Sequence, residues 1–487
     1  MLWDAVGIRN GSPFVFVFQE YASPKYFGYR AINSSEMKRF YSIILLLSLL
    51  FKKAIYRGKT CSVDCSCFPS QCKMEQLKET PILLISLDGM SPLYISGRFA
   101  NTPYLDYIAR VGVKSEFMYN VFPTSTWPNH HSMMTGLYSE SHGIVANDFW
   151  DPKFNETFYH GSHSSNYDPK FWNQSEPLWL TIENQGGLTG SYFWPGTYSY
   201  HEKPSYYEPL YCCRNCSFNK WMKPAPNKTY CSPNFKEPFR DRIDKIISWL
   251  KSAYPPKFIA AHFLIPDSEG HLFGPNSNEF KTAIERADRE IVGYLVNSLN
   301  LAQLLDKVNL IVISDHGFAE TRSTRQIILS DYLERGMYRC VKDETIAQIW
   351  PKYDKEDEIY YNLTIKKFPY MKVYKKEEIP EYLNWKHNRR IPPILVMAEL
   401  GWVLRTERSP GDWVRGTHGY SNHFREMWPV FFARGPAFRE GYIAPPFKNI
   451  DLYPLMCKLL GIIGRPHNGS FDNIKHILKD TCTNPCY

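Results

Sequence analysis

Four short apolar runs along the chain predict the strands of a buried sheet. They are residues 82–87, 258–265, 308–314 and 428–433. Each run is nearly continuous rather than alternating, which is typical of parallel strands that are covered on both faces. The first three runs lead into the acidic residues Asp88, Asp267 and Asp315.

A helix with one apolar face is predicted between the second and third of these runs in the chain. Its apolar residues recur three or four positions apart, at Phe280, Ile284, Ala287, Ile291 and Leu295. Strands that alternate with helices predict an α/β sandwich with a mostly parallel central sheet and helices on both faces. Polar residues at the carboxyl ends of its strands would gather along one edge of the sheet, where we expect the functional site.

A further apolar segment, residues 40–51, lies near the start of the chain between basic residues. Its twelve residues are too few to span a hydrocarbon core of about 30 Å comfortably, but they fit the centre of a signal peptide. We therefore assign residues 37–59 to a signal peptide or signal anchor and leave residues 1–36 as an unassigned extension. An uncleaved signal anchor would attach the chain to a membrane through residues 40–51, and the alternative is a buried core helix.

The composition is that of a globular chain with a modest basic excess. Of its 487 residues, 44% are hydrophobic, which is enough for a large core. The net charge of +8 arises mainly in the first 60 residues, which hold nine Lys or Arg and three Asp or Glu. A nucleic-acid-binding face needs clustered basic residues in the folded part, so we expect no sequence-specific nucleic-acid binding.

Cysteines and glycosylation sequons favour an oxidising compartment. Ten of the twelve cysteines fall in three clusters, at residues 61–72, 212–231 and 482–486, without the Cys-His spacing of zinc fingers. The N-x-S/T sequons include Asn155, Asn173, Asn215, Asn227, Asn362 and Asn468. We therefore expect an extracellular glycoprotein with disulfide bonds, either secreted or anchored at the cell surface.

A turn rich in hydroxyl groups offers a candidate nucleophile. Residues 121–130 read V-F-P-T-S-T-W-P-N-H, with Thr124, Ser125 and Thr126 between two prolines. Proline fixes its own φ and restricts the residue before it, so this backbone should be rigid. A hydroxyl is a weak nucleophile, however, and it needs a base or a metal to activate it.

Acidic and histidine residues in four separate segments offer that metal chemistry. The candidate ligands are Asp88, Asp267, His271, Asp315, His316 and His418. Each segment follows an apolar run or is flanked by glycine, so the side chains can converge at one edge of the sheet. Three carboxylates and three imidazoles suit two zinc-like ions better than calcium or magnesium.

Together these motifs resemble the ectonucleotide pyrophosphatase/phosphodiesterase family, of the alkaline phosphatase superfamily. The matching motifs are L-D-G-M at 87–90, F-P-T-S-T-W-P-N-H at 122–130, T-G-L-Y-S-E-S-H-G-I-V-A-N at 135–147, P-D-S-E-G-H at 266–271, S-D-H-G at 314–317 and H-G-Y-S-N at 418–422. The resemblance implies an alkaline-phosphatase-like sandwich. Its catalytic phosphodiesterase domain would cover residues 81–480, between a Cys-rich linker (60–80) and a Cys-containing tail (481–487).

The resemblance also implies a mechanism. Thr126 would be the nucleophile, and Asn147 would hold a nonbridging phosphoryl oxygen. Two Zn²⁺ ions would be the cofactors, one bound by Asp267, His271 and His418 and the other by Asp88, Asp315, His316 and Thr126. Such a site cleaves a phosphodiester or phosphoanhydride bond in two steps, through a phosphothreonine that water then hydrolyses.

The residues around the nucleophile bear on the substrate. Ser125 and Trp127 stand where family members often have Lys and Phe. We predict that the Trp127 ring stacks on a nucleobase, with Tyr207 or Tyr211 closing the other side. A small-molecule nucleotide would then be cleaved to release a nucleoside 5′-monophosphate.

Two other functions fit the same scaffold. A lysophospholipase D or choline-phosphodiester hydrolase would use the same chemistry, whereas an inactive extracellular binding protein would keep only the fold. A sulfatase is disfavoured because its nucleophile derives from cysteine. Three further histidines, His130, His131 and His142, are expected to lie behind the site, to be solvated or to hold a loop.

Overall fold

The computed structural model describes residues 80–479 except 96, 98, 162, 209–236 and 409–413. Before residue 80 it describes only the antiparallel pair β1 (Ala5–Val6) and β2 (Val17–Phe18). The predicted signal segment, Cys-rich linker and tail lie almost entirely outside the described residues, so their assignment stays a prediction. Among the described residues, no helix has the length and hydropathy to cross a membrane, and residues 40–51 are not among them.

An eight-stranded sheet forms the centre of the unit that begins at Pro69. Its order is β21 (Tyr442–Ala444), β4 (Val113–Ser115), β20 (Phe431–Arg434), β11 (Asn309–Ile313), β3 (Ile82–Leu87), β10 (Phe258–Phe263), β8 (Thr189–Tyr192) and β9 (Tyr206–Glu208). Neighbouring strands are parallel except at β20, which pairs antiparallel with β11 and β4. The mostly parallel sheet is therefore confirmed, and the fourth predicted strand is its reversed member.

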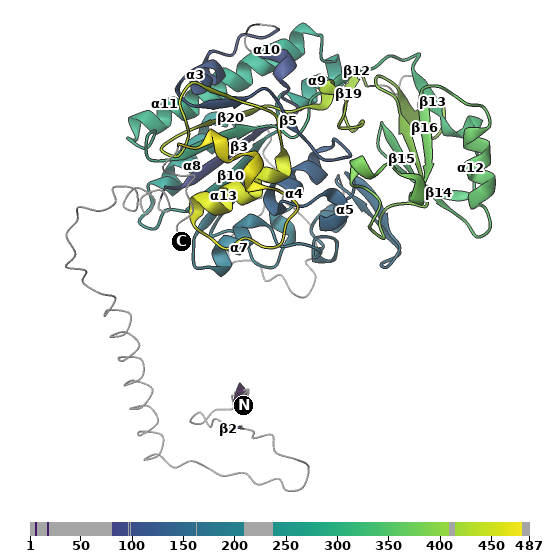
Figure 1. Ribbon diagram of the computed structural model, residues 1–487, viewed down its shortest axis with the longest axis horizontal. Coiled ribbons are helices and arrows are strands. Elements are labelled where there is room, and N and C mark those ends of the chain that lie inside the picture. The colour runs from purple at the N-terminus through teal and green to yellow at the C-terminus, as the bar shows by residue number, and fades with distance from the viewer. Residues whose placement is uncertain are drawn as a thin grey trace. The chain divides into compact units, whose positions relative to one another are not determined.

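Helices cover both faces of this sheet (Figure 1). One group consists of α3 (Pro103–Val111), α8 (Phe239–Leu250), α10 (Asn278–Arg286), the π-helical segment η4 (Ala287–Gly293) and α11 (Tyr294–Leu301). The other consists of α4 (Thr126–Thr135), α5 (Ser139–His142), α7 (Leu178–Asn184) and α13 (Leu452–Leu460). The predicted helix over 280–299 corresponds to α10, η4 and α11, and its five apolar residues are all fully buried.

Between β11 and β20 the chain forms a second, smaller structure, which we call the inserted lobe (residues 319–417). It is entered and left by the pair β12 (Ala319–Glu320) and β19 (Gly416–Thr417). Its antiparallel sheet has the order β14 (Tyr338–Lys342), β15 (Ile346–Pro351), β17 (Ile394–Ala398) and β16 (Met371–Lys375). The remaining pair is β13 (Gln326–Ile328) with β18 (Val403–Arg405), and α12 (Glu356–Thr364) packs on β16. A second hydrophobic core, separate from that of the main sheet, is formed mostly by residues of this lobe.

Smaller elements connect the main sheet to its helices. They are the hairpin β6 (Asp148–Asp151) and β7 (Glu156–Tyr159), the pair β5 (Met118–Tyr119) and β22 (Phe447–Lys448), and the short helices α6 (His163–Asn166) and α9 (Asp267–Phe273). The turn that precedes α9 follows β10 directly, which brings α9 to the carboxyl edge of the sheet.

Candidate active site

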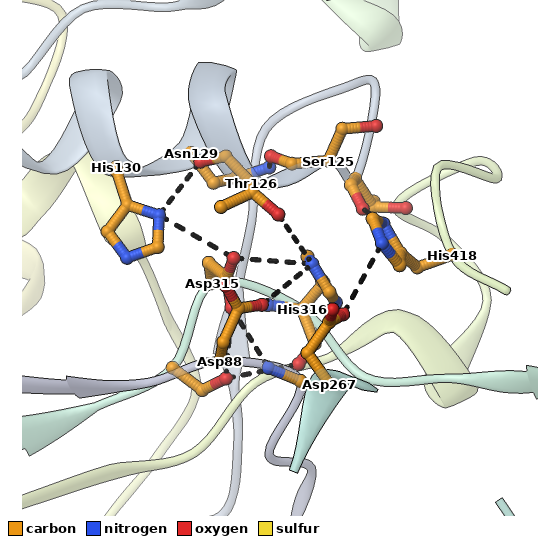
Figure 2. A network of polar contacts seen from close by, with 12 residues as sticks. Asp88, Ser125, Thr126, Asn129, His130, Asp267, Asp315, His316 and His418 are labelled. Atoms are coloured by element: carbon orange, nitrogen blue, oxygen red, sulfur yellow. Dashed lines mark hydrogen bonds and ion pairs between the residues drawn. The ribbon is translucent and has the colours of Figure 1, made fainter. Parts of the chain in front are cut away.

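Thr126 is the first residue of α4 and lies at the carboxyl edge of the sheet. Ser125 before it is extended (φ −116°, ψ 157°), and the Asn129 amide donates to the carbonyl oxygens of Ser125 and Pro123. This short loop is buried, whereas Thr126 itself is partly exposed. Its Oγ1 lies 3.2 Å from His316 Nε2 (Figure 2). The free N–H groups and dipole of a helix N-terminus favour an anion such as a phosphate at this position.

Two buried carboxylates lie beneath Thr126. Asp88 directly follows β3, and Asp315 follows the neighbouring strand β11 after one residue, so strand pairing alone brings them together. They are 1% and 0% exposed. His316 Nε2 lies 3.4 Å from Asp88 Oδ1 and 3.2 Å from Asp315 Oδ2.

A more exposed set of side chains completes the cluster. Asp267 and His271 lie one turn apart on α9, and His418 follows β19 at the exit of the inserted lobe. Asp267 Oδ1 is 3.5 Å from His271 Nε2 and 3.6 Å from His418 Nε2. The two imidazole Nε2 atoms are 3.2 Å apart. All six predicted ligand side chains thus converge near Thr126.

Within the described residues, two overlapping groups could hold a metal ion. One is Asp88, Asp315 and His316, and the other is Asp267, His316 and His418. His316 belongs to both, whereas the family resemblance implies that it binds one ion only. The division of ligands between two ions therefore stays a prediction.

The donor atoms of the cluster fit divalent cations. Among the described residues, the buried oxygens Asp88 Oδ1, Asp267 Oδ1 and Asp315 Oδ2 have no hydrogen-bond partner. The three histidines each place Nδ1 3.1 Å from a backbone carbonyl oxygen; the pairs are His271 with Gly416, His316 with Gly317 and His418 with Thr124. A carbonyl only accepts, so Nδ1 carries the proton and the Nε2 lone pair faces the cluster, as in histidine metal ligands.

Without a bound cation, the charged form of the buried Asp88 carboxylate is unfavourable. Burial, followed by the charges of Asp315 and Asp267, raises the pKa of Asp88 well above its usual range. Burial, followed by two neighbouring imidazoles, lowers the pKa of His418 well below its usual range. A neutral imidazole is the form that binds a metal, and a cation would relieve the repulsion among the carboxylates.

Asn147 is placed beside the nucleophile, as predicted. Its Oδ1 accepts a hydrogen bond from the backbone N–H of Trp127 at 3.0 Å. This bond occupies the amide oxygen and leaves the NH₂ group to donate. A donor next to Thr126 can stabilise charge that develops on a phosphoryl oxygen.

The predicted substrate-binding aromatic residues are less favourably placed. Trp127 is only 3% exposed, and its ring packs against Phe158, Trp172 and Tyr198. This burial leaves little of the indole for a nucleobase to stack on, and it matches a packing role instead. Tyr207 lies on β9, the edge strand three positions from β3, and Tyr211 lies outside the described residues.

Two histidines lie directly behind the candidate ligands. His130 Nδ1 is 2.8 Å from the Thr126 carbonyl oxygen (Figure 2), and His262 Nε2 is 2.8 Å from Asp88 Oδ2. Sequence reasoning gave His130 no specific role and missed His262. The sequence did contain a signal for His262. It is a single imidazole inside the apolar run of β10, and a buried imidazole needs a hydrogen-bond partner. His142, expected to hold a loop, accepts a hydrogen bond from the backbone N–H of Ile144 in the following loop at 3.1 Å and contacts Ser132 Oγ on α4 at 2.9 Å.

Known proteins are similar to this chain in sequence. The family model described as type I phosphodiesterase / nucleotide pyrophosphatase matches residues 82–421. Human ectonucleotide pyrophosphatase/phosphodiesterase family member 5 is 38% identical over 405 residues, which are 83% of this chain and 79% of that protein. The bis(5′-adenosyl)-triphosphatase enpp4 of Xenopus laevis is 38% identical over 400 residues, which are 82% of this chain and 81% of that protein.

A solved structure agrees with these matches. It is the murine ectonucleotide pyrophosphatase/phosphodiesterase 5, as an inactive threonine-to-alanine variant in complex with AMP. It has a TM-score of 0.74 and 37% sequence identity, and the match covers 82% of this chain and all of that one. The predicted α/β fold and hydrolase class are thereby confirmed. The chain belongs to the type I phosphodiesterase/nucleotide pyrophosphatase family.

Proposed function

We propose that this chain is an extracellular, metal-dependent phosphodiesterase that cleaves nucleotides and releases nucleoside 5′-monophosphates. The observation that carries the proposal is the position of Thr126, whose Oγ1 points into a cluster of three carboxylates and three imidazoles. The AMP bound by the murine relative supports a nucleotide as substrate. The six retained ligand side chains argue against an inactive binding protein.

The reaction begins at Thr126. Its Oγ1 attacks phosphorus and loses its proton, the bond to the first leaving group breaks, and a phosphothreonine forms. Asn147 donates to a nonbridging oxygen as charge shifts toward it. Water then attacks the phosphothreonine, the P–Oγ bond breaks, and the nucleoside monophosphate leaves.

Two metal ions, which we propose to be Zn²⁺, would be held by the six carboxylate and imidazole side chains. Bound there, they would supply a Lewis acid that lowers the pKa of the attacking hydroxyl and stabilises both the attacking and the leaving oxygen. The chain's own contribution is to aim Thr126, because the Pro123–Pro128 segment and Asn129 fix the backbone that carries it.

The extracellular location is supported by surface sequons. Asn155, Asn173 and Asn468 are exposed in the structure, so a glycan could be attached to each of them without unfolding the domain. Asn215 and Asn227 lie outside the described residues. Secretion from a eukaryotic cell followed by enzymatic deglycosylation should shift the mobility of the protein on a gel, and an unchanged band would contradict this part of the proposal.

The proposal is tested by changing Thr126 alone. Thr126→Ala should abolish turnover of the p-nitrophenyl ester of thymidine 5′-monophosphate while the six other ligands still retain metal. Thr126→Ser is the matched control, because it keeps a hydroxyl and should keep measurable turnover. Wild-type activity in the Ala variant would remove Thr126 as the nucleophile.

The substrate class is tested with a second ester. We expect a higher kcat/KM for the thymidine ester than for p-nitrophenyl phosphorylcholine. The opposite order would favour the choline-phosphodiester hydrolase that the sequence also allows. Equal failure on both esters, with metal bound, would favour the inactive binding protein.

A further inference from the structure

Two buried histidines that the proposed reaction does not use contact the candidate ligands from behind. His262 is on β10 and His130 is on α4, one turn after Thr126. Both are almost completely excluded from solvent, and their rings meet edge to face with centroids 4.5 Å apart. Neither belongs to the candidate metal-binding groups. Burying an imidazole costs free energy unless its nitrogens are hydrogen-bonded, so their partners indicate their role.

His262 holds one oxygen of Asp88. Its Nε2 is 2.8 Å from Asp88 Oδ2, and both side chains are 1% exposed. The other oxygen, Asp88 Oδ1, has no hydrogen-bond partner in the part of the chain that the structure describes, and it lies 3.4 Å from His316 Nε2. A carboxylate that binds a metal is ionised and can only accept, so His262 is the donor in the metal-bound state. This hydrogen bond therefore selects which oxygen of Asp88 faces the metal-binding group.

His130 supports the same region from the helix side. Its Nδ1 is 2.8 Å from the Thr126 carbonyl oxygen and 3.5 Å from Asp315 Oδ2. Its Nε2 is 2.8 Å from Ser86 Oγ, on the strand that ends just before Asp88. His130 thus connects the first turn of α4 to β3, and its ring packs edge to face against the His262 ring.

We propose that His262 is a positioning residue for Asp88, an inference that rests on the proposed function. By fixing the carboxylate with Oδ1 toward Asp315 and His316, it raises the metal affinity of that group. Partners that hold a metal ligand from behind typically contribute about 10- to 100-fold in affinity. The effect should fall on this group and leave the group containing His418 nearly unchanged, because His262 hydrogen-bonds to Asp88 and interacts electrostatically with Asp315, and both acids belong to the first group.

The test compares two substitutions in the metal-free full chain. His262→Phe keeps a ring of similar shape but removes the donor, whereas His262→Gln keeps an N–H donor at the end of the side chain. Zinc affinities are measured by competition with a chromophoric chelator. We expect the Phe variant to bind one of its two ions about 10- to 100-fold more weakly and the Gln variant to recover most of that loss.

A buried histidine away from the ligands provides the control. His142, which contacts Ser132, is changed to Phe, and both zinc affinities should stay at the wild-type values. A wild-type chain that binds no zinc would overturn the proposed function and this inference together. Two wild-type zinc sites with unchanged affinity in His262→Phe, or a Gln variant no better than Phe, would overturn this inference alone. If the Phe variant does not fold, His262→Leu gives the same comparison.

Discussion

Two regions of the molecule bury carboxylates, and they differ in what compensates the charge. Next to the inserted lobe, Asp151 on β6 is fully buried and accepts hydrogen bonds from Arg389 at 3.0 and 2.7 Å and from Arg390 at 2.7 Å. At the sheet edge, Asp88 and Asp315 are buried as deeply. Within the described part of the chain, no ion pair joins either of them to a Lys or Arg.

The difference separates a structural acid from a functional one. Although burial acts to raise the pKa of Asp151, the two guanidinium groups outweigh it and hold that pKa below the usual range. Burial and neighbouring carboxylates instead raise the pKa of Asp88. A buried acid with fixed cationic partners stabilises one conformation, whereas a cluster of buried acids without such partners is suited to a cation from outside.

Removing a carboxylate from the sheet edge should have the largest effect. Asp315→Asn keeps the size of the side chain but loses the charge and one anionic ligand atom. Since loss of an indirect partner already costs about 10- to 100-fold, we expect kcat/KM to fall by more than about 100-fold and one zinc equivalent to be lost. Metal analysis of the purified variant and steady-state kinetics measure both. Two retained zinc equivalents would contradict the assignment of Asp315.

Breaking the Arg-paired acid should instead damage the fold. Arg390→Met leaves Asp151 with one cationic partner, Arg389, and removes donors to the carbonyl oxygens of Gly143 and Phe171. Removing one member of a buried ion pair typically costs about 3–5 kcal/mol, which denaturant unfolding can measure. The control is Arg389→Met, whose loss should be smaller because the Arg389 side chain is 36% exposed. If Arg390→Met unfolded like the wild type but lost metal, Asp151 would be the functional acid, which contradicts the structural role assigned to it.

Metal removal should destabilise the folded chain through the loss of metal at the sheet edge, and not through the Arg-paired acid Asp151. A ligand that binds the native state at 100 times its Kd stabilises it by about 2.7 kcal/mol, so a chelator should lower the Tm of the wild-type chain. The Asp315→Asn variant should respond less, and the Arg389→Met variant should respond like the wild type. A chelator effect of equal size in all three proteins would mean that the metal is bound elsewhere.

The two regions were also unequally predictable from sequence. The apolar run at 82–87 coincides with β3, and strand pairing then places Asp88 beside Asp315. Local pattern therefore predicted both the sheet and the convergence of the ligands. The run at 428–433 predicted a strand but not its direction, because β20 returns from the inserted lobe and pairs antiparallel with β11.

Contacts that join distant segments were not predictable. Arg390 and Asp151 are 239 residues apart in the sequence, and no local sequence pattern predicts that they form a pair. His262 was missed because one polar residue in a buried strand has no periodic signature. The expectation that Trp127 stacks on a base came from its neighbour in sequence, whereas its burial depends on Phe158, Trp172 and Tyr198, which arrive from three later segments.

A third buried acid, Asp288 in η4, gives the smallest effect and refines the comparison. It has no cationic ion pair among the described residues and accepts from the backbone N–H groups of Tyr104 and Leu105 at the start of α3, at 3.1 and 2.8 Å. Burial raises its pKa from 3.8 to about 6, these two hydrogen bonds lower it in part, and the charges of Asp106 and Arg289 act in opposite directions.

Because the folded state holds this proton more tightly than the unfolded state, the contribution of Asp288 to stability falls as pH rises from about 4 to about 6, and it is constant above that range. Asp288→Asn has no proton to lose. The free energy of unfolding of the variant minus that of the wild type should therefore increase between pH 4 and pH 7, by up to about 3 kcal/mol at 1.36 kcal/mol per pKa unit. Urea unfolding of both proteins at several pH values measures this difference. The Asn side chain has one acceptor oxygen where Asp288 has two. The hydrogen bond lost for this reason changes the free energy of unfolding by the same amount at every pH, so only the change of the difference with pH tests the prediction.

A difference that is flat between pH 4 and pH 7 would show that backbone N–H groups alone keep Asp288 ionised, as the two arginines do for Asp151.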